Sequence, residues 1–214
     1  MGGRLPIDNA ARVGHEPRTM KNLALRLIAA LALPALAHAG PPVIKARVEE
    51  PAVPETMGGC SLKCGFPWSV EVQADGGQQA EPVKKLNDEK AETAWTAADG
   101  TSGIGAKLKL VFPKKLHTEI EGNIPIYGLD IINGAWTSEE QWKVRARVKK
   151  VRLYYRDKPL ADVTFSDSRR WQRVMFPDKF ARSGDWMTFE ILEIYPGEKG
   201  AGVAITEIVL QGAH

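Results

Sequence analysis

The sequence has few of the residues on which catalysis, metal binding or membrane insertion commonly depend. Only two of its 214 residues are cysteines and four are histidines. It contains no serine-hydrolase, zinc-protease or phosphate-binding-loop motif. Its most apolar run, Leu27–Leu36, is too short to cross a bilayer, which takes about twenty residues. The composition therefore gives little support to an enzyme of a familiar class or to a membrane-spanning chain.

The chain also lacks an excess of positive charge in the part that we expect to fold. It has 29 basic and 26 acidic residues in all, of which residues 1–39 hold five basic and two acidic ones. The remainder is therefore balanced at 24 of each. A nucleic-acid-binding protein needs surplus positive charge to displace the counterions of the phosphates. We therefore expect no nucleic-acid partner.

The first 39 residues have the pattern of a secretory signal peptide. Basic residues follow Met20, then comes the apolar run Leu27–Leu36, and Ala37-His38-Ala39 supplies the small residues that precede a signal-peptidase cleavage site. We interpret residues 1–39 as a signal peptide and expect Met20 to be its true start of translation. The mature chain would then begin at Gly40. The protein is then exported to the periplasm or the extracellular space, with no transmembrane segment in the mature chain.

Residues 40–58 contain four prolines and no aromatic residue. Such a composition buries too little apolar surface to offset the entropy of ordering, so it predicts a linker. One domain is then expected over residues 59–214. Cys60 and Cys64 lie at its start, and in an exported protein so close a pair is more often a disulfide than part of a metal site.

Alternation of apolar and polar residues predicts β-strands through most of this domain. In the run Ala106–Phe112, for example, apolar residues occupy one face and lysines the other. Between Ile191 and Leu192 the alternation slips, which predicts either a β-bulge or a strand that is buried on both sides. A short helix is possible only at Ser138–Lys143. The expected strands are Phe66–Val72, Ala106–Phe112, Tyr127–Asn133, Lys150–Tyr155, Ala161–Phe165, Gln172–Phe176, Met187–Tyr195 and Val203–Leu210. The fold class is thus all-β, an antiparallel β-sandwich of the jelly-roll kind.

A series of short motifs resembles a known family. The run Leu86-Asn-Asp-Glu-Lys-Ala-Glu-Thr-Ala-Trp95 is similar to the opening L-x-D-G-x-x-x-T-x-W of galactose-binding-like, discoidin (coagulation factor 5/8 type C) sandwiches. Further motifs follow at Gly103–Gly105, Leu108–Phe112, Gly128–Gly134, Arg147–Leu153, Ile191–Gly197 and Ala204–Leu210. Their order is similar to a bacterial subfamily named after the translocation domain of NAD glycohydrolase toxins. The resemblance covers about residues 60–212. It implies a binding module for carbohydrate, the cell surface or another protein.

Many members of this superfamily hold a structural calcium ion, and the matching positions here are Asp88, Thr93 and Glu207. Two departures argue against the ion in this chain. Lys90 stands where calcium-binding members tend to have a second acid, and its ammonium would repel a cation; Glu89 replaces the usual glycine. The alternative is a polar clamp that joins the first loop to the last strand. We therefore expect no cofactor, with calcium as a disfavoured possibility.

The segment from 133 to 147 carries the residues that we predict to bind a ligand: Asn133, Trp136, Trp142, Arg145 and Arg147. Tryptophan and arginine dominate binding hot spots, and an arginine fork suits a carboxylate or a pair of sugar hydroxyls. For the tryptophans, Arg147 and Asn133 a structural interpretation is also open. One tryptophan would cap the sandwich, Arg147 would form an internal ion pair, and Asn133 would open a turn with Gly134.

Our leading functional hypothesis is an exported, non-catalytic module that recognises a glycan or a cell-envelope component through loops at one end of the sandwich. The second is a protein-interaction module that assists the secretion or delivery of a partner such as a toxin. The third is an unrecognised hydrolase, in which a carboxylate pair such as Glu139 and Glu193 would flank a glycosidic bond.

Overall fold

The computed structural model describes residues 40–49, 69–73, 83–112, 124–182 and 184–212. The expected signal peptide, the cysteine pair and residues 50–58 of the expected linker lie outside these ranges. The predictions made for them stay predictions.

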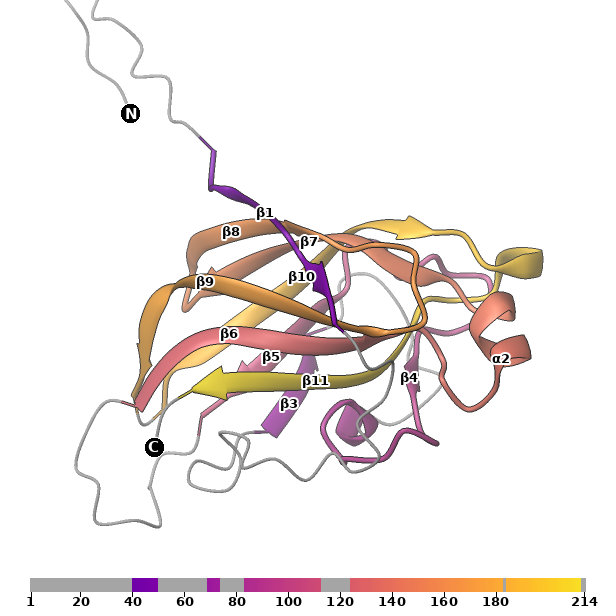
Figure 1. Ribbon diagram of the computed structural model, residues 1–214, viewed down its shortest axis with the longest axis horizontal. Helices are drawn as coiled ribbons and strands as arrows, with labels where there is room; N and C mark the ends of the chain where they lie inside the picture. The colour runs from indigo at the N-terminus through magenta and orange to yellow at the C-terminus, as the bar shows by residue number, and fades with distance from the viewer. Residues whose placement is uncertain (1–39, 50–68, 74–82, 113–123, 183, 213–214) are drawn as a thin grey trace, which may run out of the picture. The chain divides into compact units, whose positions relative to one another are not determined.

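The described chain folds into two sheets, and the predicted all-β sandwich is confirmed. The six-stranded sheet has the order β1-β8-β7-β10-β5-β3, and the five-stranded sheet has the order β2-β9-β6-β11-β4 (Figure 1). The strands are β1 Val43–Lys45, β2 Arg47–Val48, β3 Ser69–Gln73, β4 Trp95–Thr96, β5 Lys107–Val111, β6 Ile124–Asn133, β7 Arg147–Tyr155, β8 Lys158–Thr164, β9 Trp171–Ala181, β10 Trp186–Tyr195 and β11 Ala204–Gly212. The helical elements are α2 Glu139–Val144 and two short 3-10 helices, η1 Val83–Leu86 and η2 Glu198–Gly200.

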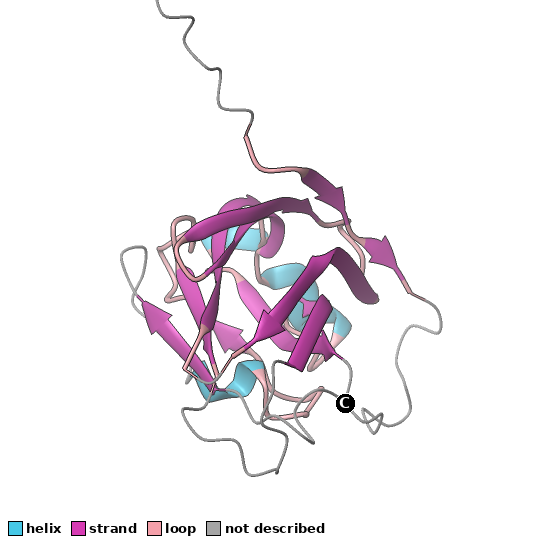
Figure 2. Cartoon of the chain, turned by 90° about the vertical axis from the view of Figure 1, so that its left-hand side faces the viewer, coloured by secondary structure: helices cyan, strands magenta, loops and turns pink. Residues whose placement is uncertain are grey.

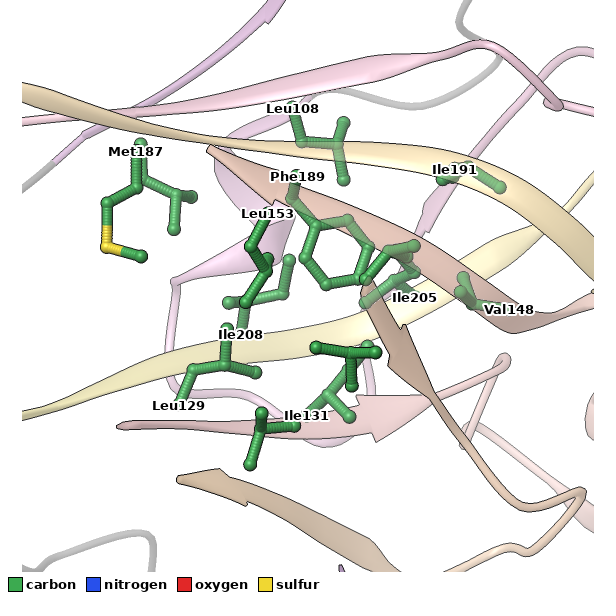
Figure 3. Packing of buried hydrophobic residues seen from close by; sticks show 14 of the residues in the cluster. Leu108, Leu129, Ile131, Val148, Leu153, Met187, Phe189, Ile191, Ile205 and Ile208 are labelled. Atoms are coloured by element: carbon green, nitrogen blue, oxygen red, sulfur yellow. The ribbon is translucent and has the colours of Figure 1, made fainter. Parts of the chain in front are cut away.

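The core lies between the two sheets and follows the alternation seen in the sequence. Leu108 and Leu110 of β5 are buried, while Lys107 and Lys109 on the other face are partly exposed. Phe189 of β10 packs among residues from both sheets (Figure 3). Fully burying one such side chain contributes about 1.5–3 kcal/mol to folding.

Strand β10 contains the expected irregularity. Its pairing with β7 shifts register between Ile191 and Glu193, at the slip in the apolar pattern. A single extra residue moves the following side chains to the opposite face, so the bulge keeps both halves of the strand facing the core.

The proline content of residues 40–58 predicted a linker, but residues 43–48 within this range form strands. Strand β1 pairs in parallel with β8, and β2 pairs antiparallel with β9, so the segment runs along one edge of both sheets. Ala46 between the two strands is buried in the main core. The prolines at 41 and 42 only precede this segment, and the alternating run after them has enough apolar residues to pair.

The two helical elements α2 and η2 contact each other at one end of the sandwich, at the right of Figure 1. Strand β11 ends toward the opposite end, from which Figure 2 views the molecule. Within the described residues, no helix combines the length and the apolar character needed to cross a membrane.

Candidate functional site

The short helix α2 begins where the sequence supplies a cap. Ser138 precedes it, and the Ser138 hydroxyl accepts a hydrogen bond from the backbone N–H of Gln141 at 3.0 Å. Glu139 and Glu140 occupy the first turn, where negative charge is favourable, and Lys143 occupies the last. Arg145 is the C-cap residue. The helix possible at Ser138–Lys143 is thus present, and the predicted binding segment contains it.

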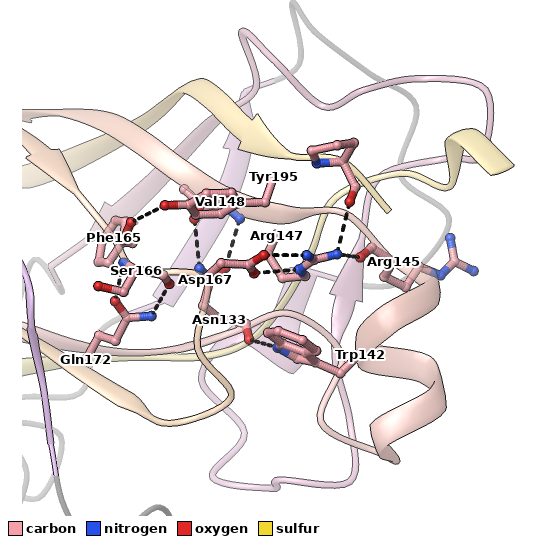
Figure 4. Close-up of polar contacts among 11 residues, drawn as sticks. Asn133, Trp142, Arg145, Arg147, Val148, Phe165, Ser166, Asp167, Gln172 and Tyr195 are labelled. Carbon is pink, nitrogen blue, oxygen red and sulfur yellow. Dashed lines mark hydrogen bonds and ion pairs between the residues drawn. The ribbon is translucent and has the colours of Figure 1, made fainter. Parts of the chain in front are cut away.

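Three of the predicted site residues meet in one cluster beneath α2: Asn133, Trp142 and Arg147 (Figure 4). The Trp142 indole N–H donates to the backbone oxygen of Asn133 at 3.1 Å. The Arg147 guanidinium lies 4.6 Å from the centroid of the Trp142 ring. The Asn133 amide exchanges two hydrogen bonds with the backbone of Val148, at 2.7 and 2.9 Å. We call this group the inner cluster.

The Arg147 side chain is only 9% exposed and its donors are used within the domain. Two of its nitrogens donate to the two carboxylate oxygens of Asp167, at 3.0 and 2.8 Å. A third donates to the backbone oxygens of Arg145 and Pro196, at 3.0 and 3.1 Å. Arg147 therefore joins β7 to the segments around Asp167 and Pro196, which is the ion-pair role that the sequence left open.

Gly134 lets the inner cluster close. Its φ is +87°, and a β-carbon added there would lie 2.6 Å from Cδ1 of Trp142 and 2.9 Å from Cγ of Arg147. The Asn133-Gly134 pair thus ends β6, and Gly134 goes on to form an isolated bridge with Ile205 of β11.

Trp136 is 6% exposed and lies next to the inner cluster, because Trp142 packs against the apolar cluster that contains it. It packs with Ile132 and Trp171 in a second apolar cluster. Its backbone N–H donates to the Thr206 hydroxyl at 3.0 Å, and the Arg169 guanidinium lies 5.6 Å from its ring centroid. Trp136 therefore stabilises the folded domain and presents little surface to a ligand.

Arg145 and Trp142 are the two predicted site residues that are not buried, and the side chain of Arg145 is the one directed away from the inner cluster. Its backbone is held from both sides, because its N–H donates to Gln141 at 3.1 Å and its carbonyl accepts from Arg147. Its side chain is 22% exposed and extends away from the inner cluster (Figure 4). Among the described residues, its guanidinium makes one polar contact, an ion pair with Asp99, whose side chain is 69% exposed. A fixed backbone thus presents a lightly used guanidinium at the surface.

The polar clamp foreseen as an alternative to calcium forms between the first loop and β11. The Thr93 hydroxyl donates to both oxygens of Asp88, at 2.9 and 2.8 Å, and the backbone N–H of Glu89 donates to Glu207 at 3.2 Å. Lys90 takes part through its backbone N–H, which donates to Asp88 at 3.1 Å, while its side chain is exposed. In the described part of the chain, no three histidine, cysteine or acidic side chains group as metal ligands would. Hydrogen bonds within the domain thus connect Asp88 with Thr93, and the first loop with Glu207 of β11.

Sequence reasoning did not find Asp99 or Asp167, the two acids that pair with the predicted arginines. Asp99 is 46 residues from Arg145, and Asp167 is 20 residues from Arg147. Asp99 precedes Gly100, so the sequence marked the position as a turn, and no local pattern connects such a turn with a distant arginine.

Three comparisons with known proteins extend these observations. The family model described as the NAD glycohydrolase translocation F5/8 type C domain matches residues 66–211. No curated protein matches the chain.

Solved structures with a similar fold include carbohydrate-binding modules. A structure of CBM32-1, CBM32-2 and the M60 catalytic domains of Clostridium perfringens ZmpB gives a TM-score of 0.52 at 10% identity, covering 84% of this chain and 17% of that one. The CBM32-1 and CBM32-2 domains of the same protein in complex with GalNAc give 0.52 at 10% identity, covering 80% and 40%. A fragment of a Bacteroides thetaiotaomicron protein named as a chitobiase gives 0.51 at 16% identity, covering 78% and 97%. The chain thus spans under one fifth of the ZmpB structure that also holds the catalytic domains. At these identities the comparisons show the fold.

Proposed function

The chain belongs to the NAD glycohydrolase translocation F5/8 type C domain family, and we propose that it is an exported, non-catalytic binding module that recognises a glycan of the cell envelope. The site is the surface around Arg145 at the α2 end of the sandwich. The fold that the chain shares with carbohydrate-binding modules supports this proposal, but fold alone does not assign function.

The observation that carries the proposal is that the backbone of Arg145 is held rigidly while its guanidinium has, among the described residues, a single exposed partner, Asp99. The inner cluster fixes the base of α2, and the hydrogen bonds of Gln141 and Arg147 to the Arg145 backbone fix the point from which its side chain extends. A recognition group performs best when its support is rigid, because little conformational entropy is then lost on binding. Trp142, which is half-buried, belongs to this support through its contacts with Asn133 and Arg147.

The environments of Glu139 and Glu193, the two candidate catalytic carboxylates, argue against a hydrolase. Glu139 pairs with Lys143 at 2.7 Å, and Glu193 pairs with Lys149 at 2.8 Å. In each pair the hydrogen bond from the lysine lowers the pKa of the glutamate. A general acid in glycoside hydrolysis needs a raised pKa, so that it carries a proton at neutral pH. Neither residue has the environment that this role requires.

The test is a glycan-array screen of the full chain, followed by titration with the sugars that bind. We expect Arg145→Ala to weaken binding at least tenfold. Lys143→Ala is the matched control, because it removes one positive charge from α2 only two residues before Arg145, and it should change the affinity less than twofold. A glycan that binds both variants equally well would place the site elsewhere, and a screen in which no glycan binds would refute the proposal.

A second candidate function is a protein-interaction module that assists the secretion or translocation of a partner. The family to which the chain belongs is named for translocation, which favours this candidate. Affinity capture from periplasmic extract with the full chain as bait tests it directly. Specific capture of one protein, lost in Arg145→Ala and retained in Lys143→Ala, would replace the glycan with a protein at the same surface.

A further inference from the structure

We propose that Arg145 is an anion subsite, and that the ligand of the α2 end is an acidic glycan whose carboxylate replaces the Asp99 carboxylate on the Arg145 guanidinium. In the structure, the Asp99 carboxylate pairs with the guanidinium nitrogen that the carboxylate of the ligand takes over on binding. This inference rests on the proposed function and names the class of glycan.

The donor capacity of the two neighbouring arginines differs. A guanidinium has five N–H donors arranged in a fork that matches the two oxygens of a carboxylate. Arg147 uses four of these donors, two in bonds to Asp167 and two in bonds to backbone carbonyls. Arg145, in the described part of the chain, uses one nitrogen for one oxygen of Asp99. The remaining donors of Arg145 are available to a carboxylate that approaches along the fork.

Asp99 can leave Arg145 without disturbing its own turn. That turn is held by Thr101, whose backbone N–H and hydroxyl both donate to the carbonyl of Ala98, at 3.1 and 2.6 Å. Gly100 supplies the positive φ that the turn requires, at +82°. The Asp99 carboxylate contributes only the ion pair, and ion pairs with one highly exposed partner add little to stability. Its displacement therefore costs little.

The same pairing explains why the replacing group is an anion. A neutral sugar that displaced Asp99 would exchange a charged partner of the guanidinium for hydroxyl groups, and the Coulomb attraction between opposite charges would be lost. A carboxylate ligand would replace one negative charge by another, and it could bond two guanidinium nitrogens where Asp99 bonds one. Asp99 therefore selects against neutral ligands, because both kinds of ligand must displace it and only an anion restores the charge pair of the guanidinium.

The test compares D-galacturonate with D-galactose, which differ at C6, where the first carries a carboxylate. We expect the full chain to bind galacturonate at least tenfold more tightly at low ionic strength, with the difference shrinking as salt is added. Asp99→Asn should raise the affinity for galacturonate about threefold or more, because it removes the competing carboxylate. Arg145→Ala should abolish the preference for galacturonate.

The matched control is Glu139→Gln, which removes one negative charge from an exposed residue of α2 and should change either affinity less than twofold. If galactose binds as tightly as galacturonate and loses affinity in Arg145→Ala, the inference is wrong while the proposed function stands. If Asp99→Asn weakens galacturonate binding, Asp99 supports Arg145 rather than competing with the ligand, and the inference is also wrong. If no glycan binds, both fail.

Discussion

Arg145 and Arg147 are two residues apart in the sequence and have opposite roles in the structure. Arg147 points into the domain, is 9% exposed and bonds to a carboxylate and two carbonyls. Arg145 points outward and pairs with Asp99 at the surface. The strand that begins at Arg147 and the helix that ends before Arg145 turn the two side chains in different directions.

The comparison teaches that residue type alone does not identify a binding group. What separates the two arginines is the number of donors left over after folding. The polar groups of the inner cluster are used in hydrogen bonds that stabilise the domain. The Arg145 guanidinium at the surface has donors that no described residue uses in this way. The predictions that follow test this division, first in the interior and then at positions where the division is least expected to matter.

The largest effect is expected for Trp136→Ala. Removing a buried tryptophan costs about 3–5 kcal/mol of unfolding free energy, because packing is lost and a cavity remains. Trp136 is 6% exposed in the second apolar cluster, so we expect a loss in this range. Chemical denaturation followed by circular dichroism measures it. A loss below about 1 kcal/mol would show that Trp136 belongs to the accessible surface, contrary to its position in the fold.

The direct test of the comparison is the pair Arg147→Met and Arg145→Met. Methionine keeps most of the side-chain volume and removes the charge. In Arg147→Met, two carbonyls and the half-exposed Asp167 lose their donors, and we expect a loss of about 2–4 kcal/mol, discounted for the exposure of Asp167. In Arg145→Met we expect less than about 1 kcal/mol, since an exposed pair is lost. Equal losses in the two variants would remove the basis of the comparison.

Much of the fold was predictable from the sequence because strands impose a period of two. The alternation of Leu108 and Lys109 places one in the core and the other outside, and the slip after Ile191 marks a bulge. Residues 43–48 were missed because prolines at 41 and 42 dominate the local composition. Their partners β8 and β9 lie more than a hundred residues away in the chain.

The candidate site was less predictable, since its geometry depends on pairs that are distant in sequence. The segment from 133 to 147 contains the site, yet nothing local distinguishes Arg145 from Arg147. The distinction comes from Asp99 and Asp167, each on a different loop. A residue's donor count after folding is a tertiary property, and only the folded chain reveals it.

Gly134→Ala tests the close approach of the backbone to the inner cluster. Alanine at a φ of +87° is strained by about 1–2 kcal/mol, and its β-carbon would lie 2.6 Å from the Trp142 ring. We expect a total loss of about 2–3 kcal/mol. Gly100→Ala is the matched control, because its φ is +82° and nothing lies within 4 Å of the added atom. The difference between the two variants in a denaturant melt measures the close contact; no difference would mean that the Trp142 ring moves aside freely.

The smallest effect is expected at the Asp88 clamp, where the same reasoning about used and unused groups applies to oxygen acceptors. Asp88 already accepts bonds from Thr93 and from the Lys90 backbone, and Glu207 accepts one from Glu89. Calcium needs six to eight oxygens, so it would have to displace these donors and gather further ligands. We therefore expect neither added calcium nor a chelator to change the melting temperature. An ion that bound the native state at a hundredfold excess over its Kd would stabilise it by about 2.7 kcal/mol, which a thermal melt detects readily. If calcium raises the melting temperature and Asp88→Asn abolishes that rise, the clamp opens for the ion. The carboxylates of Asp88 and Glu207 would then exchange their hydrogen bonds within the domain for bonds to calcium.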